Sequence, residues 1–470
     1  MNVLLILFGK LLSMMSRFLN VGSGSTWPGH VALSLNKNFI KELIKANPQL
    51  KIILIAGTNG KTTTGKLIQT ILGKAGYRVF QNEAGANLLN GIASSLLLHS
   101  SILSTINYNY AIFEVDENTL PLALKEITPD YLILLNLFRD QLDRYGEVNT
   151  IASKWKKAFE NLSKKTSLIL NADDPQIAQL AINEVQRPRH SGKPQRIQNL
   201  HGSERFWTSQ NDENEILYFG LHDKNLAQTK HQHAADSTYC PNCNSKLYYH
   251  SVYYSHLGNW ECKNCENIRP KNIFSTPPPS RLTGTYNLYN ILATVLVTKK
   301  IGVSDEIINK SLRTFIPAFG RQEIFDINGK KAQIFLSKNP TSFNESLRTV
   351  ASLGARNVVF VLNDRIPDGR DVSWIWDVDT EEPDGIKSII ISGERAYDMG
   401  LRLKYSSSSE IKNERLKIKN KSVKFKIIKD LKRAIMQGLE EMNKSDILYI
   451  LPTYSAMLEV RKILTGKKIL

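Results

Sequence analysis

The chain has 470 residues, which is long enough for two or three domains that each bury a core. Its 42% hydrophobic and 22% charged residues are ordinary for a globular protein and exclude a disordered or fibrous chain. The formal charge of +17 arises from 61 basic and 44 acidic residues and favours an anionic partner, such as phosphate groups or a membrane surface. The basic residues are scattered and form no run interleaved with aromatic residues, so we disfavour nucleic acid as the partner.

The first 20 residues carry apolar side chains at helical spacing. These apolar positions are Leu4, Leu5, Phe8, Leu11, Leu12, Met15, Phe18 and Leu19. A secretory signal needs a charged start and a small-residue cleavage site, neither of which is clear, and the run is too short to span a bilayer. We interpret it as an amphipathic helix packed on the protein body, in preference to a membrane-surface helix. We expect a cytoplasmic protein, with a peripheral position at the inner face of the membrane as the open alternative. Glycines and serines in residues 20–28 predict a linker, so residues 1–50 are expected to form a helix and a linker.

Short apolar runs alternate with helical patterns along the rest of the chain. The first series of runs covers residues 52–56, 110–115, 131–135 and 167–170. Such runs fit strands buried on both faces, and their alternation with helices predicts an α/β fold with a doubly wound parallel sheet. The alternation stops around residues 187–202 and resumes after about residue 283, with further strands predicted at 358–362, 388–392 and 447–451. We therefore predict a central domain over residues 51–320 and a C-terminal Rossmann-like domain over 321–470.

The most specific motif follows the first apolar run. It is a shortened Walker A pattern that reads Gly57-Thr58-Asn59-Gly60-Lys61-Thr62-Thr63-Thr64. The glycines allow backbone N–H groups to point at phosphate oxygens, and the helix that follows offers its positive N-terminus. Lys61 would bridge the β- and γ-phosphates, and the Thr62 hydroxyl would help to hold Mg²⁺. Residues 57–63 are therefore predicted to bind ATP.

A magnesium ion beside a triphosphate needs further oxygen ligands. Acidic residues follow the second apolar run at Glu114, Asp116 and Glu117, where a buried strand is expected to end. Ligands in doubly wound sheets gather at the carboxyl ends of the strands. We predict Glu114 as the second Mg²⁺ ligand beside Thr62, whereas Glu117 fits an acidic cap at a helix start better.

All four cysteines lie in two C-x-x-C pairs. Cys240 and Cys243 form the first pair, Cys262 and Cys265 form the second, and 18 residues separate the two pairs. This spacing is typical of four thiolates around Zn²⁺. The alternative is a disulfide or a redox dithiol, which the paired spacing and the expected cytosolic location disfavour. Four protein ligands leave no open position, so the predicted zinc is structural and lies in a ribbon over residues 236–270, inserted into the central domain.

Five segments resemble those of the Mur ligases and folylpolyglutamate synthases, which join amines to carboxylates through acyl phosphates. Besides the phosphate loop, these are Asn136 to Gly146, Asn171 to Pro175, Gly284 to Asn290, and Gly320-Arg321. The resemblance implies that Asn287 and Asn290 lie on the adenine side of ATP and that Arg321 contacts its phosphates. Gln141 and Tyr286 depart from the family, which has metal-binding histidines there. Fewer than 60 residues precede the loop, so the usual substrate-binding N-terminal domain is expected to be missing.

Three features resemble one branch of this family, the MurT-type ligase subunits of lipid II isoglutaminyl synthases of Gram-positive bacteria. They are the predicted zinc ribbon, the short N-terminal part and the segment Asp368-Gly-Arg-Asp371-Val-Ser-Trp-Ile-Trp-Asp377. The resemblance implies an enzyme of peptidoglycan synthesis that amidates the D-glutamate α-carboxylate of lipid II to D-isoglutamine, using ATP and an acyl phosphate. Lys61 would act in the transfer of the phosphoryl group.

The same resemblance implies a heterodimer with a GatD-like glutamine amidotransferase that supplies ammonia, since the cysteines of this chain are assigned to zinc. An aspartate of this chain would orient the catalytic histidine of the partner. Its place in the motif assigns this role to Asp371, ahead of Asp364, Asp368 and Asp377. The alternative is that Asp371 only caps a loop.

Two other functions stay open at this point. One is a folylpolyglutamate- or cyanophycin-type ligase that acts on a soluble acid and needs neither zinc ribbon nor glutaminase. The other is a zinc-ribbon ATPase that binds nucleic acid, which the positive charge would favour.

Overall fold

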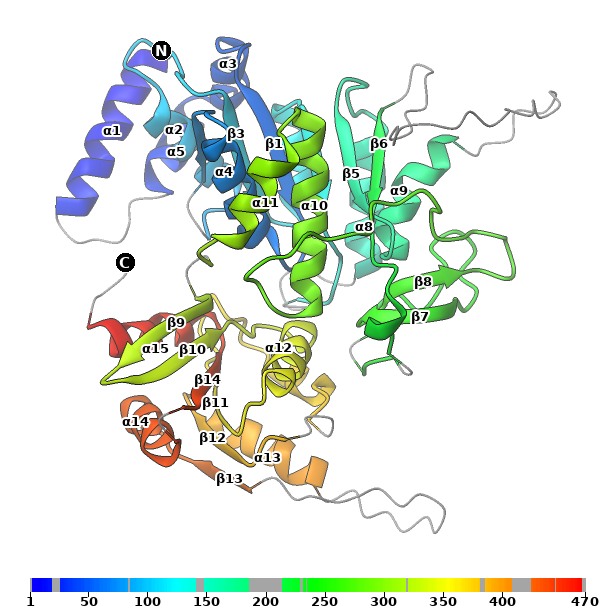
Figure 1. The fold of residues 1–470 in the computed structure, drawn as a ribbon. Helices are drawn as coiled ribbons and strands as arrows, with labels where there is room; N and C mark the ends of the chain where they lie inside the picture. The colour runs from blue at the N-terminus through cyan, green and yellow to red at the C-terminus, as the bar shows by residue number, and fades with distance from the viewer. Residues whose placement is uncertain are drawn as a thin grey trace.

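We analysed a computed structural model of the chain (Figure 1). The structure describes residues 2–18, 26–82, 85–140, 148–185, 214–228, 231–233, 235–317, 320–380, 385–407, 424–443 and 445–466. Within these residues, no helix is both long and apolar enough to cross a lipid bilayer.

The central domain is built on six parallel strands in the order β2-β3-β1-β4-β5-β6. The strands are β1 (Lys51–Ala56), β2 (Val79–Gln81), β3 (Tyr110–Val115), β4 (Tyr131–Leu134), β5 (Ser167–Asn171) and β6 (Ile216–Phe219). The connecting helices are α4 (Lys61–Lys74), α5 (Leu89–His99), α6 (Leu120–Glu126), α8 (Val148–Phe159), α9 (Pro175–Val185), α10 (Thr285–Ile301) and α11 (Asp305–Arg313). The predicted parallel α/β sheet is confirmed.

Helices cover both faces of this sheet, which explains why its strands are apolar throughout. In β1, Ile52 and Leu54 pack into one hydrophobic cluster with α5, α6 and α8. Ile53 and Ile55 point to the opposite face and pack into a second cluster with α4, α10 and α11. A strand between two such layers buries every side chain, so it has a continuous apolar run instead of an alternating pattern.

Residues 26–50 correct the expectation of one helix and a linker. They form α2 (Trp27–Leu35) and α3 (Phe39–Lys45) after α1 (Asn2–Phe18). Pro28 lies within the first turn of α2, where a proline is tolerated because its missing N–H would have no helical partner. Residues 20–25 of the predicted linker lie outside the described residues.

The packing of α1 differs from the prediction. Leu5 and Ile6 are buried against the central domain, but Leu4, Phe8 and Leu11 are exposed although they were expected to face the protein. Figure 1 shows α1 lying along the outside of the domain beside α2 and α5.

The segment predicted to form a zinc ribbon, called the ribbon below, contains an antiparallel hairpin of β7 (Tyr248–Tyr254) and β8 (Leu257–Glu261) beside the central sheet. Trp260 is buried and donates its indole N–H to the carbonyl of Ala172 at 3.1 Å. The buried carboxylate of Asp173 pairs with Arg269 and accepts a hydrogen bond from Tyr289 at 2.7 Å. The residues after β5 therefore attach the ribbon to the sheet.

The C-terminal domain is a second six-stranded sheet in the order β13-β12-β11-β14-β10-β9, below the first in Figure 1. Its strands are β9 (Arg321–Ile327), β10 (Lys330–Phe335), β11 (Asn357–Val361), β12 (Ser388–Ser392), β13 (Lys424–Ile427) and β14 (Ile447–Pro452). All neighbours are parallel except β9 and β10. Helices α12 (Pro340–Ser352) and α13 (Ala396–Ser407) and the 3₁₀ turn η2 (Ser373–Asp377) pack on one face, and α14 (Leu431–Glu441) and α15 (Tyr454–Thr465) on the other.

Candidate active site

The predicted phosphate loop connects β1 to α4 at the carboxyl edge of the central sheet. Gly60 has φ 94°, and a Cβ atom on it would lie 2.1 Å from Asn290 Oδ1, so only glycine fits here. Asn136, at the end of β4, holds the loop because its Oδ1 accepts from the Asn59 N–H at 2.8 Å and its Nδ2 donates to the Asn59 carbonyl at 3.1 Å. The loop shape is thus set by neighbouring side chains as well as by its glycines.

Lys61 is the first residue of α4 and is largely buried in the loop. Its Nζ donates to the Gly57 carbonyl at 2.5 Å and lies 3.7 Å from Glu117 Oε2. Glu117 is buried, so the interpretation of this residue as a solvated helix cap is wrong. The ammonium group is held at the mouth of the loop, within reach of a bound phosphate.

The residues predicted for Mg²⁺ lie together. Thr62 Oγ1 donates to Glu114 Oε2 at 2.6 Å, and both side chains are buried. Burial raises the pKa of Glu114, against the opposing effects of Arg321, Thr62 and Lys61. Glu114 Oε1 and Glu117 Oε1 are buried and accept no hydrogen bond from the described residues. Hard oxygen ligands with unused lone pairs beside a phosphate loop fit a magnesium ion.

Asn287 and Asn290, predicted on the adenine side, lie in the first two turns of α10 and are buried. Asn290 Nδ2 donates to Asn287 Oδ1 at 3.0 Å, and Thr64 Oγ1 donates to Asn290 Oδ1 at 3.4 Å. Both asparagines line the same cleft as Gly60. Tyr286, which replaces a family histidine, lines it too and accepts a hydrogen bond from Gln322 at 2.6 Å, whereas Gln141 lies outside the described residues.

This cleft lies between the two domains and has a volume of about 450 Å³. The central domain lines it with the phosphate loop and the acidic residues that follow β3. From the C-terminal domain, Arg321 lies at the start of β9, and the first turns of α12 contribute Ser342 and Ser346. Burial lowers the pKa of Arg321, although Glu114 opposes this effect. The structure therefore brings together all the predicted ATP- and Mg²⁺-binding regions.

Lys338 is a cleft residue that sequence reasoning missed. It lies between β10 and α12 and forms an ion pair with Asp140 of the central domain. Burial lowers its pKa, but Asp140 and Glu117 outweigh this effect and raise the pKa above its usual value. A lysine just before the Asn339 cap of α12 could have indicated an anion site, but only the tertiary structure shows that Lys338 lines the same cleft as the phosphate loop.

A second, smaller cavity of about 60 Å³ adjoins the cleft and shares Asp140 and Lys338 with it as lining residues. Its other side is formed by the acidic segment, with Asp368, Asp371 and Asp377 among the lining residues. The Asp140–Lys338 pair therefore lies between the ATP cleft and the Asp371 loop.

The four candidate aspartates, Asp364 and the three of the acidic segment over residues 368–377, differ in their surroundings. Asp368 is buried and accepts hydrogen bonds from the Ser455 N–H and hydroxyl. Asp364 pairs with Arg395 at 2.9 Å, and Asp377 pairs with Arg139 at 3.2 Å. Asp371 is exposed and, among the described residues, accepts only from Ser373, whose N–H and hydroxyl lie at 2.8 and 2.9 Å. Its bonds to Ser373 close a turn at the start of η2, in agreement with the alternative of a loop-capping carboxylate, and it also presents a carboxylate to the surface.

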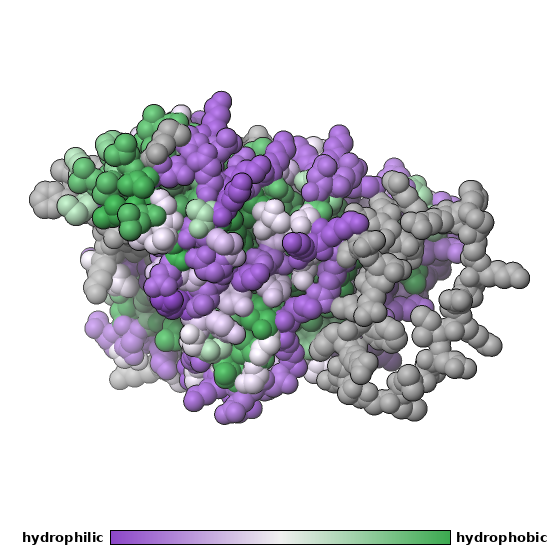
Figure 2. Space-filling model, turned by 90° about the horizontal axis from the view of Figure 1, so that it is seen from above, coloured by the Kyte–Doolittle hydropathy of each residue, from purple (hydrophilic) through white to green (hydrophobic). Residues whose placement is uncertain are grey.

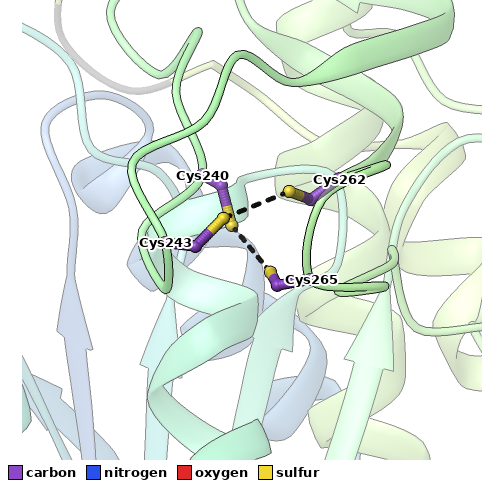
Figure 3. Close-up of side chains that lie close together, drawn as sticks. All are labelled: Cys240, Cys243, Cys262 and Cys265. Atoms are coloured by element: carbon purple, nitrogen blue, oxygen red, sulfur yellow. Dashed lines mark hydrogen bonds between the residues drawn. The ribbon is translucent and has the colours of Figure 1, made fainter.

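The four cysteines converge from two loops of the ribbon (Figure 3). Their sulfur atoms all lie within 4.8 Å of one another, with 3.6 Å between Cys240 and Cys265 and 3.4 Å between Cys243 and Cys262. A tetrahedral site with Zn–S bonds of about 2.3 Å needs sulfur separations near this size, and a disulfide is much shorter. Burial raises the pKa of the Cys240 thiol, an effect that a bound cation would oppose. The donor set fits zinc.

Comparisons with known proteins agree with this geometry. The Mur ligase middle domain family matches residues 55–211, and the MurT ligase C-terminal family matches residues 336–457. Among solved structures, a pseudomurein peptide ligase type C from Methanothermus fervidus superposes with a TM-score of 0.61 at 19% identity, covering 91% of this chain and 81% of that one. MurF ligase from Thermotoga maritima in complex with ADP has a TM-score of 0.57 at 15% identity, covering 92% and 83%. The fold and the phosphate site define a protein of the Mur ligase class.

Sequence relatives narrow the assignment. The lipid II isoglutaminyl synthase (glutamine-hydrolyzing) subunit MurT of Staphylococcus aureus strain COL is 32% identical over 402 residues, 81% of this chain and 83% of that protein. The corresponding subunit of Streptococcus pneumoniae strain R6 is 30% identical over 471 aligned positions, covering 96% and 94%. The chain belongs to the MurT family.

Proposed function

We propose that this protein is the ligase subunit of a lipid II isoglutaminyl synthase and amidates the D-glutamate α-carboxylate of lipid II at the cytoplasmic face of the membrane. The observation that carries the proposal is the pair of adjoining cavities. One combines a phosphate loop with three cationic side chains, and the other leads from it to Asp371. Family membership and the names of the relatives support the same reaction.

In the first step, the substrate carboxylate oxygen attacks the γ-phosphorus of ATP, which yields an acyl phosphate and ADP. Lys61 and Arg321, which line the cleft from opposite domains, would neutralise the charge on the transferred group. Lys338 would hold the acceptor carboxylate or its acyl phosphate. Thr62 and Glu114 would hold Mg²⁺, which would supply positive charge to offset that of the phosphates. Closure between the two domains would exclude water from the acyl phosphate.

In the second step, ammonia attacks the carbonyl carbon of the acyl phosphate. The bond between this carbon and the phosphate oxygen breaks, which forms the amide and releases phosphate and a proton. Because free ammonia is scarce at neutral pH, a GatD-like glutaminase is proposed as the partner in a heterodimer. Asp371 would orient its catalytic histidine, since it is the exposed carboxylate of the segment and lacks an ion pair to any described residue. The small cavity beside Asp371 would carry ammonia to the cleft past Lys338.

The ribbon cysteines are proposed to hold one structural zinc ion, because all four positions would be filled by thiolates. This leaves no cysteine of the chain for glutamine hydrolysis.

The test uses the chain copurified with its partner, lipid II, ATP and either glutamine or ammonium chloride. Asp371→Asn should lower glutamine-dependent amidation by about 10²-fold or more and leave amidation from added ammonia intact. Glu394→Gln, which changes an exposed carboxylate of the same domain, should preserve both activities. Full glutaminase activity in Asp371→Asn would refute the role of Asp371. Ligation of an amino acid to a soluble acid, independent of glutamine, would instead favour the folylpolyglutamate- or cyanophycin-type function.

A further inference from the structure

Helix α1 presents an apolar face to solvent. The exposed side chains, most of them between 40% and 71% accessible, are Val3, Leu4, Leu7, Phe8, Leu11, Met14 and Met15. In Figure 2 a compact hydrophobic cluster appears at the end of the molecule where Figure 1 places α1. Scattered apolar residues are normal on protein surfaces, but a contiguous patch of this kind marks an interaction site.

The opposite side of α1 is fixed to the central domain, so the helix lies flat on the protein. Leu5, Ile6 and Ser13 are buried. Lys10 Nζ donates to the Ser100 carbonyl at 2.5 Å, and Asn2 donates to Glu42 at 2.9 Å. These contacts anchor both the start and the middle of the helix. A partner can therefore contact only the exposed face of α1, along the side of the helix.

The surroundings of the patch are basic. Residues 1–42 contain the four basic residues Lys10, Arg17, Lys37 and Lys41 and a single carboxylate, Glu42, which accepts from Asn2 and Asn36. The Lys37 and Lys41 side chains are exposed. At the start of α2, Trp27 is 64% exposed, and an exposed tryptophan suits the boundary between water and lipid headgroups. The turn after Ser100 exposes Leu103 to 78%.

We infer that the exposed face of α1, with Trp27 and the lysines of residues 37–41 beside it, is a docking surface for an anionic lipid bilayer. Apolar side chains of a helix that lies in the membrane plane insert among the acyl chains while flanking cations bind lipid phosphates. A second copy of the chain fits less well, because a two-fold interface would place these four cations against their equivalents with only Glu42 of the same segment to balance them.

The lipid-docking role of α1 rests on the proposed function in one respect, that the acceptor is a lipid. Docking through α1 would confine the ligase to the surface where that substrate is held. It would also orient the central domain, because α1 is attached along its length to α2 and α5. The proposed surface lies outside the ATP cleft, so its loss should leave the chemistry on a soluble acceptor unchanged.

The experiment is vesicle flotation of the full-length chain with its partner. The vesicles contain phosphatidylcholine alone or phosphatidylcholine with phosphatidylglycerol. The wild-type protein should float with the anionic vesicles, and Leu4→Ser/Phe8→Ser/Leu11→Ser should weaken this binding at least about tenfold. Lys37→Glu/Lys41→Glu should reduce the preference for anionic lipid. The matched control is Leu122→Ser/Ile324→Ser/Leu353→Ser, which changes three exposed apolar side chains on other elements and should bind as wild type does.

Equal binding by the wild type and the α1 triple variant would overturn the inference, as would an absence of binding to either vesicle. A wild-type dimer that the triple variant dissociates, seen by analytical ultracentrifugation without vesicle binding, would assign the face to a second copy. ATP turnover with a soluble stem-peptide acceptor is measured on the same samples. If the wild-type protein shows no ATP turnover with this acceptor, the result contradicts the proposed function. If it turns over ATP but does not float with vesicles, the result contradicts only the lipid-docking role of α1.

Discussion

At the scale of single residues, Lys61 is the side chain on which phosphoryl transfer should depend most. Lys61→Ala removes the cation that lies over the loop and should lower ATP-dependent amidation by about 10³-fold, because charge on the transferred phosphoryl group is no longer neutralised. Lys66→Ala is the control, since Lys66 lies on the same helix but is exposed and bonded to Gln69. Turnover is measured as ADP release in the presence of both substrates. Near-normal turnover in Lys61→Ala would contradict the assignment.

Arg269 illustrates a different kind of residue, one that supports the ribbon. It pairs with Asp173 at 2.5 Å in a fully buried position, and burial raises the pKa of Asp173 despite this partner. Arg269→Met leaves the carboxylate unpaired, which should cost about 3–5 kcal/mol of stability once Asp173 is ionised.

The sign of the pH dependence follows from the direction of that shift. Without Arg269 the folded-state pKa of Asp173 rises further above the unfolded value of about 3.9, so the folded protein favours the protonated acid. The variant should be closest to wild type at low pH and lose stability as pH rises from about 4 toward the raised pKa. Melting temperatures over this range measure the effect, and Arg269→Met/Asp173→Asn should flatten it. A pH-independent difference between Arg269→Met and wild type would contradict this account.

At the scale of elements, the ribbon should depend on its metal. Cys243→Ser removes one of four converging thiolates, and we expect loss of the single zinc ion per chain and a lower melting temperature. Elemental analysis and thermal unfolding measure these two effects. Lys263→Ala changes an exposed side chain beside Cys262 and should retain the metal. A wild-type chain that purifies without zinc and is unaffected by strong chelators would show that the cluster is not a zinc site.

The elements that sequence reasoning found are those with continuous apolar runs. Strands β1, β3 and β12 are buried on both faces, so their sequences mark them clearly. The edge strands β2 and β6 were missed because each has only three or four residues and partly exposed side chains. Strand β9 was missed because it alternates between half-buried and exposed residues. A sheet edge offers too few apolar residues to be recognised without its neighbour.

The residues of the candidate site also fall into those that the sequence predicts and those that only the tertiary structure shows. The phosphate loop, Glu114 and the cysteines belong to local patterns whose spacing has a chemical reason. The ion pair between Lys338 and Asp140 joins two residues that lie 198 positions apart and belong to different domains. The choice among the four aspartates also needed the structure, since their sequence context does not show that Asp364 and Asp377 are already paired with arginines.

At the scale of the whole molecule, Arg139 connects the two domains. It pairs with Asp236 of the central domain and, at 3.2 Å, with Asp377 of the C-terminal domain. Arg139→Met should increase amide exchange in both partner segments and raise the KM for ATP several-fold, because closure of the cleft needs both domains. Arg365→Met is the matched control, since that arginine pairs with Glu394 and Glu459 within one domain. Hydrogen exchange and steady-state kinetics measure the two effects, and identical behaviour of the two variants would contradict the role of Arg139.

The residues that lead into the ribbon also contact the C-terminal domain. Gln232 donates to Glu345 at 3.0 Å, and His233 lies 2.5 Å from Asp379, a few residues before Cys240. Loss of the metal from the ribbon would therefore weaken these two contacts between the domains as well as the hairpin of the ribbon. In a cell short of zinc, the phosphate loop would remain intact and could bind ATP. The central and C-terminal domains, however, would adopt the closed arrangement less often. If the cysteines hold zinc as proposed, the supply of this structural metal would then limit how fully the cell wall is amidated.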